Sequence, residues 1–163
     1  AVTVSGKTPW VWGAMRHAWS LGSPVAAITD DAQSEAAQLA SMVIAPELGA
    51  DAIAGYINTK AGIAQKMILT MITTGLAVRT GRVFSNLRVD LDASNTKWSE
   101  RQIAIVMEAG GCTRSAAKAA LESCNHNCKT AVLMVLTGLD AWKAHELLAQ
   151  NNGFIRLALQ EAP

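Results

Sequence analysis

Short apolar runs alternate with helical segments over the first 45 residues, and this alternation constrains the fold more than any other feature. Residues 1–4, 24–29 and 41–45 are uncharged and rich in β-branched or small side chains, as strands covered on both faces tend to be. Between them, residues 8–21 and 30–40 carry apolar side chains at helical spacing. The order strand, helix, strand, helix, strand predicts a parallel α/β sheet flanked by helices.

A long helix is predicted over residues 59–78, after a loop at 46–58 that contains proline and glycine. Its apolar positions extend beyond a single stripe, which predicts a helix that is buried nearly all round. The longest uncharged apolar run, residues 67–78, is shorter than the roughly 20 residues that a membrane span needs. We therefore expect no membrane partner.

The chain changes character after residue 95, where short helical segments are separated by glycine- and asparagine-containing stops. Helices are predicted over residues 97–109, 113–123, 128–136, 141–150 and 153–161. Thr113 and Asp140 are predicted N-caps. We predict two domains, an α/β domain over residues 1–92 and a small all-helical module over residues 97–163.

The nearly neutral charge of the chain gives no sign of a strongly charged partner. The net charge is +1, from 14 basic and 13 acidic residues, and the basic residues are scattered, so nothing indicates nucleic acid or an anionic membrane. Hydrophobic residues make up 50% of the chain, which predicts a surface that is buried against a partner. Three cysteines make no disulfide framework, so a reducing, cytoplasmic compartment is expected.

The residues Ser5, Gly6, Lys7 and Thr8, called the 5–8 loop below, connect the first predicted strand to the first predicted helix. Hydroxyls and backbone N–H groups at a helix N-terminus bind anions, Gly6 allows close approach of the backbone, and Lys7 adds positive charge. The pattern predicts an anion-binding site. In the alternative interpretation, Thr8 only caps the helix and Ser5 is an ordinary turn residue.

Several stretches together resemble the N-acetylmuramic acid 6-phosphate etherase family, whose wider relatives include the glucokinase regulatory protein. The matching stretches are SGKTPW from residue 5, LGSPVAAITD from residue 21, PELGADAIAG from residue 46, TKAGIAQKMILTMITTGLAVRTGRVFSNLRVDL from residue 59, and the helical segment from residue 111 onward. The resemblance implies the C-terminal half of a sugar isomerase (SIS) domain, with a parallel sheet flanked by helices. A small module resembling a ubiquitin-associated domain is implied after it.

The same resemblance implies an activity and its partners. Family members cleave the D-lactyl ether of N-acetylmuramic acid 6-phosphate by elimination and hydration, without metal or nucleotide, and act as dimers with shared active sites. The resemblance places the catalytic glutamates in an upstream half, so no catalytic residue is expected in this chain, and no cofactor or metal. The expected partners are a phosphosugar and either a second copy of the chain or the missing N-terminal half.

The chain departs from the family at its second motif. Family members carry Gly-Ser-(Ser/Thr)-Arg-x-Lys-x-Gly-Thr-x-x-Lys, whereas here Tyr56 and Ile57 replace the hydroxyl residues and Asn58 replaces the arginine. Asparagine cannot supply the bidentate, charge-assisted bonds of arginine. Asn58, Lys60 and Lys66 remain candidate substrate-site residues. The alternative for the two lysines is a solvated position at a helix end.

The remaining polar and aromatic residues favour structural interpretations. Cys112, Cys124 and Cys128 suggest a zinc site only weakly, because free cysteines commonly pack between helices. The tryptophans and methionines favour core or interface positions, with a ligand groove lined by Trp10, Trp12, Trp19, Met67 and Met71 as the alternative. His17 and His145 are expected to be solvated. The helical module is expected to pack against the SIS domain and the dimer mate, with a ubiquitin-like partner as the alternative by fold analogy alone.

The resemblance implies phosphosugar binding in an etherase of cell-wall amino-sugar recycling, with the 5–8 loop (Ser5, Gly6, Lys7 and Thr8) binding the phosphate. The alternative is a non-catalytic phosphosugar sensor or regulator, or an incomplete or degenerate homologue, which the altered residues 56–58 permit.

Overall fold

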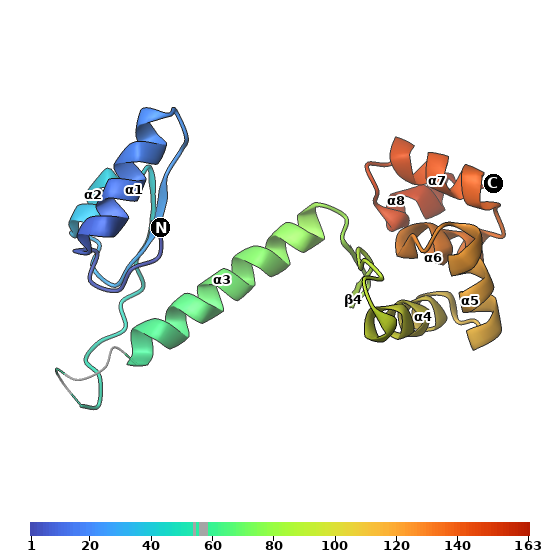
Figure 1. Cartoon of the computed structure of the whole chain (residues 1–163), viewed down its shortest axis with the longest axis horizontal. Coiled ribbons are helices and arrows are strands. Elements are labelled where there is room, and N and C mark those ends of the chain that lie inside the picture. The colour runs from blue at the N-terminus through green and yellow to red at the C-terminus, as the bar shows by residue number, and fades with distance from the viewer. Residues whose placement is uncertain (54, 56–58) are drawn as a thin grey trace. The chain divides into compact units, whose positions relative to one another are not determined.

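The computed structural model describes residues 1–53, 55 and 59–163. These residues form two compact units, Ala1–Thr73 and Thr74–Pro163, and the boundary falls within helix α3 (Figure 1). The mixed α/β character expected from the sequence is confirmed, because a small parallel sheet occurs together with many helices. The expected domains, 1–92 and 97–163, stay predictions.

The regular elements follow the expected order of strands and helices. The helices are α1 (Pro9–Ser20), α2 (Glu35–Leu39), α3 (Thr59–Arg79), α4 (Thr96–Gly110), α5 (Arg114–Ser123), α6 (Cys128–Thr137), α7 (Ala141–Gln150) and α8 (Ile155–Glu161). The strands are β1 (Ala26–Ile28), β2 (Met42–Ile44), β3 (Val83–Phe84) and β4 (Leu87–Arg88).

The sheet of the first unit is parallel, as predicted. Strand β1 pairs with β2, placing Ala27 opposite Val43. The strand expected over residues 1–4 is reduced to a single parallel bridge between Val2 and Ile28. The Thr3 N–H donates to the Ile28 carbonyl at 3.0 Å, and the Ile28 N–H donates back to the Ala1 carbonyl at 2.9 Å. Strand β1 therefore lies between the N-terminal segment and β2.

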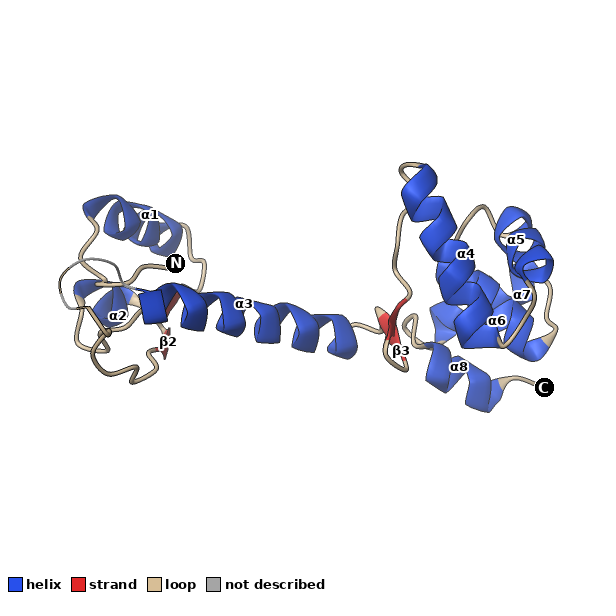
Figure 2. Ribbon diagram, turned by 90° about the horizontal axis from the view of Figure 1, so that it is seen from below, coloured by secondary structure: helices blue, strands red, loops and turns tan. Residues whose placement is uncertain are grey.

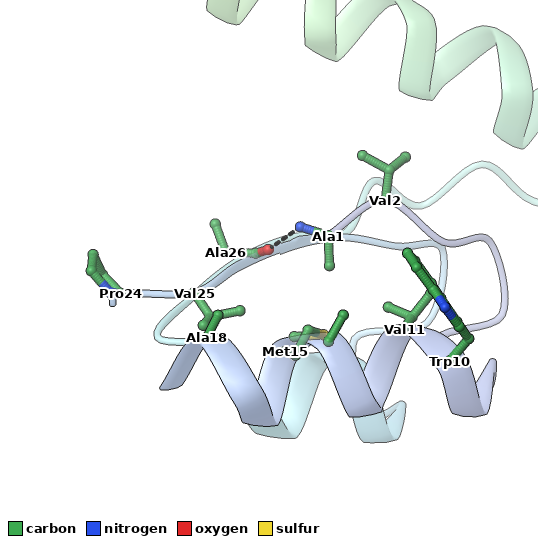
Figure 3. A pocket seen from close by; sticks show the side chains of 10 residues that line it. Ala1, Val2, Trp10, Val11, Met15, Ala18, Pro24, Val25 and Ala26 are labelled. Atoms are coloured by element: carbon green, nitrogen blue, oxygen red, sulfur yellow. Dashed lines mark hydrogen bonds between the residues drawn. The ribbon is translucent and has the colours of Figure 1, made fainter. Parts of the chain in front are cut away.

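Helix α1 packs its buried side against β1. Met15 contributes to a small core with Val25, Ala27 and Ala36, and Figure 3 shows Met15 facing the segment that contains Val25 and Ala26. Proline at the first position of the helix is favourable, since no backbone N–H is needed there. The helix ends before a glycine in the left-handed conformation.

The helix expected over residues 30–40 was wrong in its first half. Residues before Glu35 form a turn, in which the Ser34 hydroxyl donates to the Asp31 carbonyl at 2.7 Å. The same Ser34 hydroxyl accepts from the Ala37 N–H at 3.4 Å and thereby caps α2. Side chains such as serine and aspartate compete with the helix by bonding to nearby backbone groups, which explains the shortening.

The prediction that the long helix, α3, is buried nearly all round was wrong. Of its described side chains only Ala61 and Ile68 are buried. Large apolar side chains are exposed along it, at Ile63, Met67, Leu69, Met71, Ile72, Leu76 and Val78. Among the described residues, α3 is also the one helix that is long and apolar enough to cross a membrane, a criterion that core helices also meet. The apolar run at residues 67–78, which by itself is too short for a membrane span, is only the second half of this helix.

The second unit is built around helix α6, which contacts α4, α5, α7 and α8, as Figure 2 shows. The core includes Ile105, Val106, Leu121, Val132 and Leu133. Both predicted N-caps in this part of the chain are confirmed. The Thr113 hydroxyl accepts from a backbone N–H of α5, and the Asp140 carboxylate accepts from one of α7. The resemblance of this unit to a ubiquitin-associated domain stays a prediction.

A short antiparallel hairpin, β3 and β4, precedes these helices and was not anticipated from the sequence. Ser85 lies in its turn with a φ of 55°. The Asp90 carboxylate contacts Arg88 at 2.7 Å and Arg82 at 3.5 Å. Two-residue strands carry too few alternating side chains to be recognised by periodicity, which explains the omission.

Candidate functional site

The 5–8 loop lies at the carboxyl end of the N-terminal extended segment, beside the carboxyl end of β1. The Val4 carbonyl accepts two hydrogen bonds there, from the Asp30 N–H at 2.9 Å and from the Thr29 hydroxyl at 2.9 Å. Ligands of open α/β sheets bind outside the carboxyl ends of the strands. The chain thus places its candidate loop at the edge where such ligands bind.

Gly6 is the fixed point of the loop. It is buried, and its φ is +66°. A Cβ at this position would stand 2.1 Å from the Ser34 hydroxyl oxygen. The Gly6 carbonyl accepts from the Ala36 N–H at 3.1 Å and from the indole N–H of Trp12 at 2.8 Å. Glycine is therefore required both by conformation and by the close approach to α2.

The other three loop residues are exposed on either side of this fixed point. The Lys7 N–H donates to the Ser5 hydroxyl at 3.3 Å. Thr8 occupies the N-cap position of α1 in an extended conformation, but its side chain makes no capping hydrogen bond. The interpretation in which the Thr8 hydroxyl serves only as a cap therefore has no support from the geometry.

The electrostatics of this edge are mixed. The N-terminus of α1 and the Lys7 ammonium favour an anion. Asp30 follows β1 at the same edge and is exposed; slight desolvation, with a smaller effect from Asp51, raises the pKa of its carboxyl. The neighbouring Asp31 carboxylate accepts from the Gln33 N–H at 2.8 Å. An anion bound at the loop would be attracted by the N-terminus of α1 and by Lys7 and repelled by the ionised carboxylates.

The two candidate lysines of the second motif, Lys60 and Lys66, form hydrogen bonds with nearby residues of their own segment. The Lys60 ammonium donates to the carbonyls of Leu48 (3.3 Å) and Ala50, and the Lys60 N–H donates to the Asp51 carboxylate at 3.2 Å. Lys60 therefore ties the start of α3 to the preceding loop. The Lys66 ammonium donates to the Thr70 hydroxyl one turn further along α3, at 3.1 Å.

The second motif is only partly covered by the structure. Tyr56, Ile57 and Asn58 lie outside the described residues. Within the described ranges, no recorded hydrogen bond or ion pair joins Lys60 or Lys66 to the 5–8 loop. The role of Asn58, Lys60 and Lys66 in a substrate site stays a prediction.

An apolar pocket of about 330 Å³ lies between α1 and the N-terminal segment (Figure 3). Trp10 stands at its edge with 81% of its surface exposed, and Val2 is also exposed. The N-terminal ammonium donates to the Ala26 carbonyl at 2.8 Å along one side of this pocket. The only hint of this pocket in the sequence was Trp10 in the first turn of α1, which was expected to lie in a core or an interface.

The cysteines occupy packing positions of the second unit. Burial, with smaller contributions from Cys124 and Asp90, raises the pKa of Cys128 to about 12. Burial also raises the pKa of Cys124, whose thiol donates to the Asn127 carbonyl at 3.2 Å. In the part of the chain that the structure describes, no group of three or more potential metal ligands is present.

Residues around the loop at 125–127 were missed by the sequence reasoning. Gln102 is buried, and its amide NH₂ donates to the carbonyls of Leu91 (2.7 Å) and His126 (3.0 Å). The Lys129 ammonium donates to the Gly153 carbonyl at 3.0 Å, and burial lowers its pKa. These contacts depend on residues distant in sequence, and they hold the helical unit together.

The fold and the loop define a mixed α/β protein with a candidate anion-binding loop at a helix N-terminus. Curated relatives share one name. The chain is 48% identical over 160 residues to "N-acetylmuramic acid 6-phosphate etherase" of Aliivibrio fischeri (strain MJ11), covering 98% of this chain and 53% of that protein. It is 49% identical over 158 residues to the protein of that name from Klebsiella aerogenes, covering 97% and 53%.

A third relative, "N-acetylmuramic acid 6-phosphate etherase 2" of Vibrio parahaemolyticus, is 45% identical over 158 residues, covering 97% of this chain and 53% of that protein. No protein-family model matches the sequence. Over nearly its whole length the chain is homologous to N-acetylmuramic acid 6-phosphate etherases, which confirms the family resemblance predicted from the sequence. It spans about half the length of the curated relatives it matches.

Proposed function

We propose that this chain binds the phosphate of N-acetylmuramic acid 6-phosphate through the 5–8 loop, as part of an etherase of amino-sugar recycling. The support is twofold. Relatives at 45–49% identity carry that substrate in their names. The loop itself is held at Gly6 while its polar side chains are exposed at the N-terminus of a 12-residue helix.

The single observation that carries the proposal is this combination of a backbone fixed at Gly6 and exposed polar side chains at Ser5, Lys7 and Thr8. A phosphate dianion would accept hydrogen bonds from the hydroxyls of Ser5 and Thr8 and from the backbone N–H of Trp10 in the first turn of α1. Lys7 would add a positive charge that needs no fixed geometry. Since the loop is already ordered by Gly6, less conformational entropy is lost on binding.

The chemical steps are assigned by family resemblance alone. Elimination of lactate requires a base at C2 of the sugar and an acid at the leaving oxygen. The resemblance gives neither role to a carboxylate of this chain. We therefore propose that the chain binds the phosphosugar and does not cleave the ether by itself. Cytoplasmic location and a partner, either a second copy or a further half of the protein, belong to the same proposal.

A non-catalytic phosphosugar sensor is the second candidate. The observation that favours it is that the Lys60 ammonium donates hydrogen bonds to the carbonyls of Leu48 and Ala50. The altered residues at 56–58 favour it as well. A lysine held in this way donates to its own backbone loop. Release of D-lactate by the chain joined to the family's other half would favour the etherase, whereas saturable binding without release would favour the sensor.

The test of binding is a thermal-shift titration with N-acetylmuramic acid 6-phosphate. The wild-type chain should be stabilised in a saturable manner, as expected for a ligand that binds only the folded state. The Ser5→Ala/Thr8→Ala double variant should lose this stabilisation. Ser20→Ala, at the opposite end of α1, is the matched control and should keep it. Equal stabilisation of the double variant would refute the proposed role of the loop.

A further inference from the structure

We propose that Trp12 is a positioning residue for the phosphate-binding loop, acting through its indole N–H on the carbonyl of Gly6. The inference rests on the proposed function of the 5–8 loop and extends it to a residue one turn into α1. Trp12 would not touch the ligand. It would fix the direction in which the exposed hydroxyls of Ser5 and Thr8 point.

The geometry singles out this tryptophan. Its Nε1 lies 2.8 Å from the Gly6 carbonyl oxygen, and its ring is partly buried against the small core that includes Met15. Trp10 and Trp19 lie on the same helix, yet they are 81% and 67% exposed. A buried indole needs a partner for its N–H, and here that partner is the backbone of the candidate site. An apolar ring alone would fill the core without holding the loop.

The second hydrogen bond to Gly6 explains why this contact matters for ligand binding. The same carbonyl accepts from the Ala36 N–H in the first turn of α2 at 3.1 Å. The next N–H of α2, from Ala37, is taken by the Ser34 hydroxyl at 3.4 Å. Both N–H groups of α2 are therefore occupied within the fold. At α1 the Val11 N–H likewise donates to the Thr8 carbonyl, so an incoming phosphate would meet the Trp10 N–H and the exposed side chains of the 5–8 loop. Trp12 and Ala36 together hold the loop between the two helices.

The test combines a binding measurement with one on the ligand-free chain. Trp12→Phe keeps an aromatic ring and removes the N–H, and Trp19→Phe is the matched control. Calorimetric titration with N-acetylmuramic acid 6-phosphate should show a dissociation constant raised about threefold to tenfold in Trp12→Phe and unchanged in Trp19→Phe. Hydrogen exchange at the Ala36 amide should accelerate by a similar factor in the ligand-free Trp12→Phe chain.

A measurement on the unmodified chain guards against misfolding of the variant. The indole N–H resonance of Trp12 should shift on titration with the phosphosugar, with the same dissociation constant as calorimetry gives. The Trp142 resonance, from the second unit, should not shift. An unchanged Trp12 resonance during saturable binding would overturn the proposal.

The outcomes separate this inference from the proposed function. If the wild-type chain does not bind the phosphosugar, the proposed function fails, and the positioning role fails with it. Accelerated exchange at the Ala36 amide in Trp12→Phe would then still show that the Trp12 hydrogen bond to Gly6 stabilises the loop in the ligand-free chain. If the wild type binds and Trp12→Phe binds equally well, the positioning role alone is refuted, whatever the exchange rate.

Discussion

Gly6 and Ser34 approach so closely that a Cβ on Gly6 would lie 2.1 Å from the Ser34 hydroxyl oxygen. The contact joins the 5–8 loop to the first turn of α2. Because Ser34 is 2% exposed and its hydroxyl caps α2, it has no free space into which to move. The loop and α2 should therefore respond together to any change at either residue.

Gly6→Ala is predicted to destabilise the first unit by about 2–4 kcal/mol, because the clash adds to the cost of a left-handed alanine. Gly22→Ala is the matched control. Gly22 also has a positive φ, +79°, but a Cβ there meets nothing within 4 Å. Its substitution should cost only about 1 kcal/mol. Urea denaturation measures both values, and equal losses would show that the contact with Ser34 is unimportant.

The stability of the second unit is predicted to fall as the pH rises from about 9 toward 12. Burial raises the pKa of Cys128 from 9.0 to about 12, so the folded chain keeps a proton that the unfolded chain loses in this window. The stabilisation is complete below the unfolded pKa and is lost as the pH rises toward the folded one. The free energy of unfolding, measured by denaturation at several pH values in this range, should fall less steeply with pH in Cys128→Ala than in the wild type. An identical slope in that variant would contradict the account.

Self-association is predicted for the chain at micromolar concentration. Met67, Met71 and Leu76 are among the large apolar side chains that α3 exposes, and such surfaces normally become buried. Sedimentation velocity should show a dimer or larger species. Met71→Lys should shift it toward monomer, whereas Lys118→Ala, on the exposed surface of α5, should not. A stable, well-folded monomer of the wild type would contradict the prediction.

The chain alone is predicted to release no D-lactate from N-acetylmuramic acid 6-phosphate. A positioned acid and base typically contribute about 10²–10⁴-fold each, and family resemblance assigns neither to this chain. An enzymatic assay of D-lactate after incubation is the measurement, with a no-protein sample as its baseline. Release above that baseline, abolished by substitution of a carboxylate within the chain, would show that the assignment is wrong.

Local patterns predicted much of the fold. The parallel order of the first unit followed from alternating runs, and the caps Thr113 and Asp140 followed from side chains suited to helix N-termini. The shortening of α2 was missed because Ser34, four residues after the predicted start, competes for backbone hydrogen bonds. Exposure of α3 was missed because periodicity reports apolar character and not what covers it.

The candidate site was predictable only in part. Ser5, Gly6, Lys7 and Thr8 could be selected because small and hydroxyl residues preceded a proline and a helix. The contacts of Gly6 with Trp12 and Ala36 could not, because they depend on how α1 and α2 pack. Long-range hydrogen bonds of this kind leave no periodic signal in a single sequence.

An NMR titration of the 15N-labelled chain with N-acetylmuramic acid 6-phosphate tests the central claim most directly. Backbone amides of the 5–8 loop and of Trp10, in the first turn of α1, should shift in a saturable manner, because the phosphate would accept hydrogen bonds there. Amides of the helical unit, such as Lys129, should stay unchanged. Absence of saturable shifts at the loop, or shifts concentrated around Lys129 instead, would contradict the proposed phosphate site.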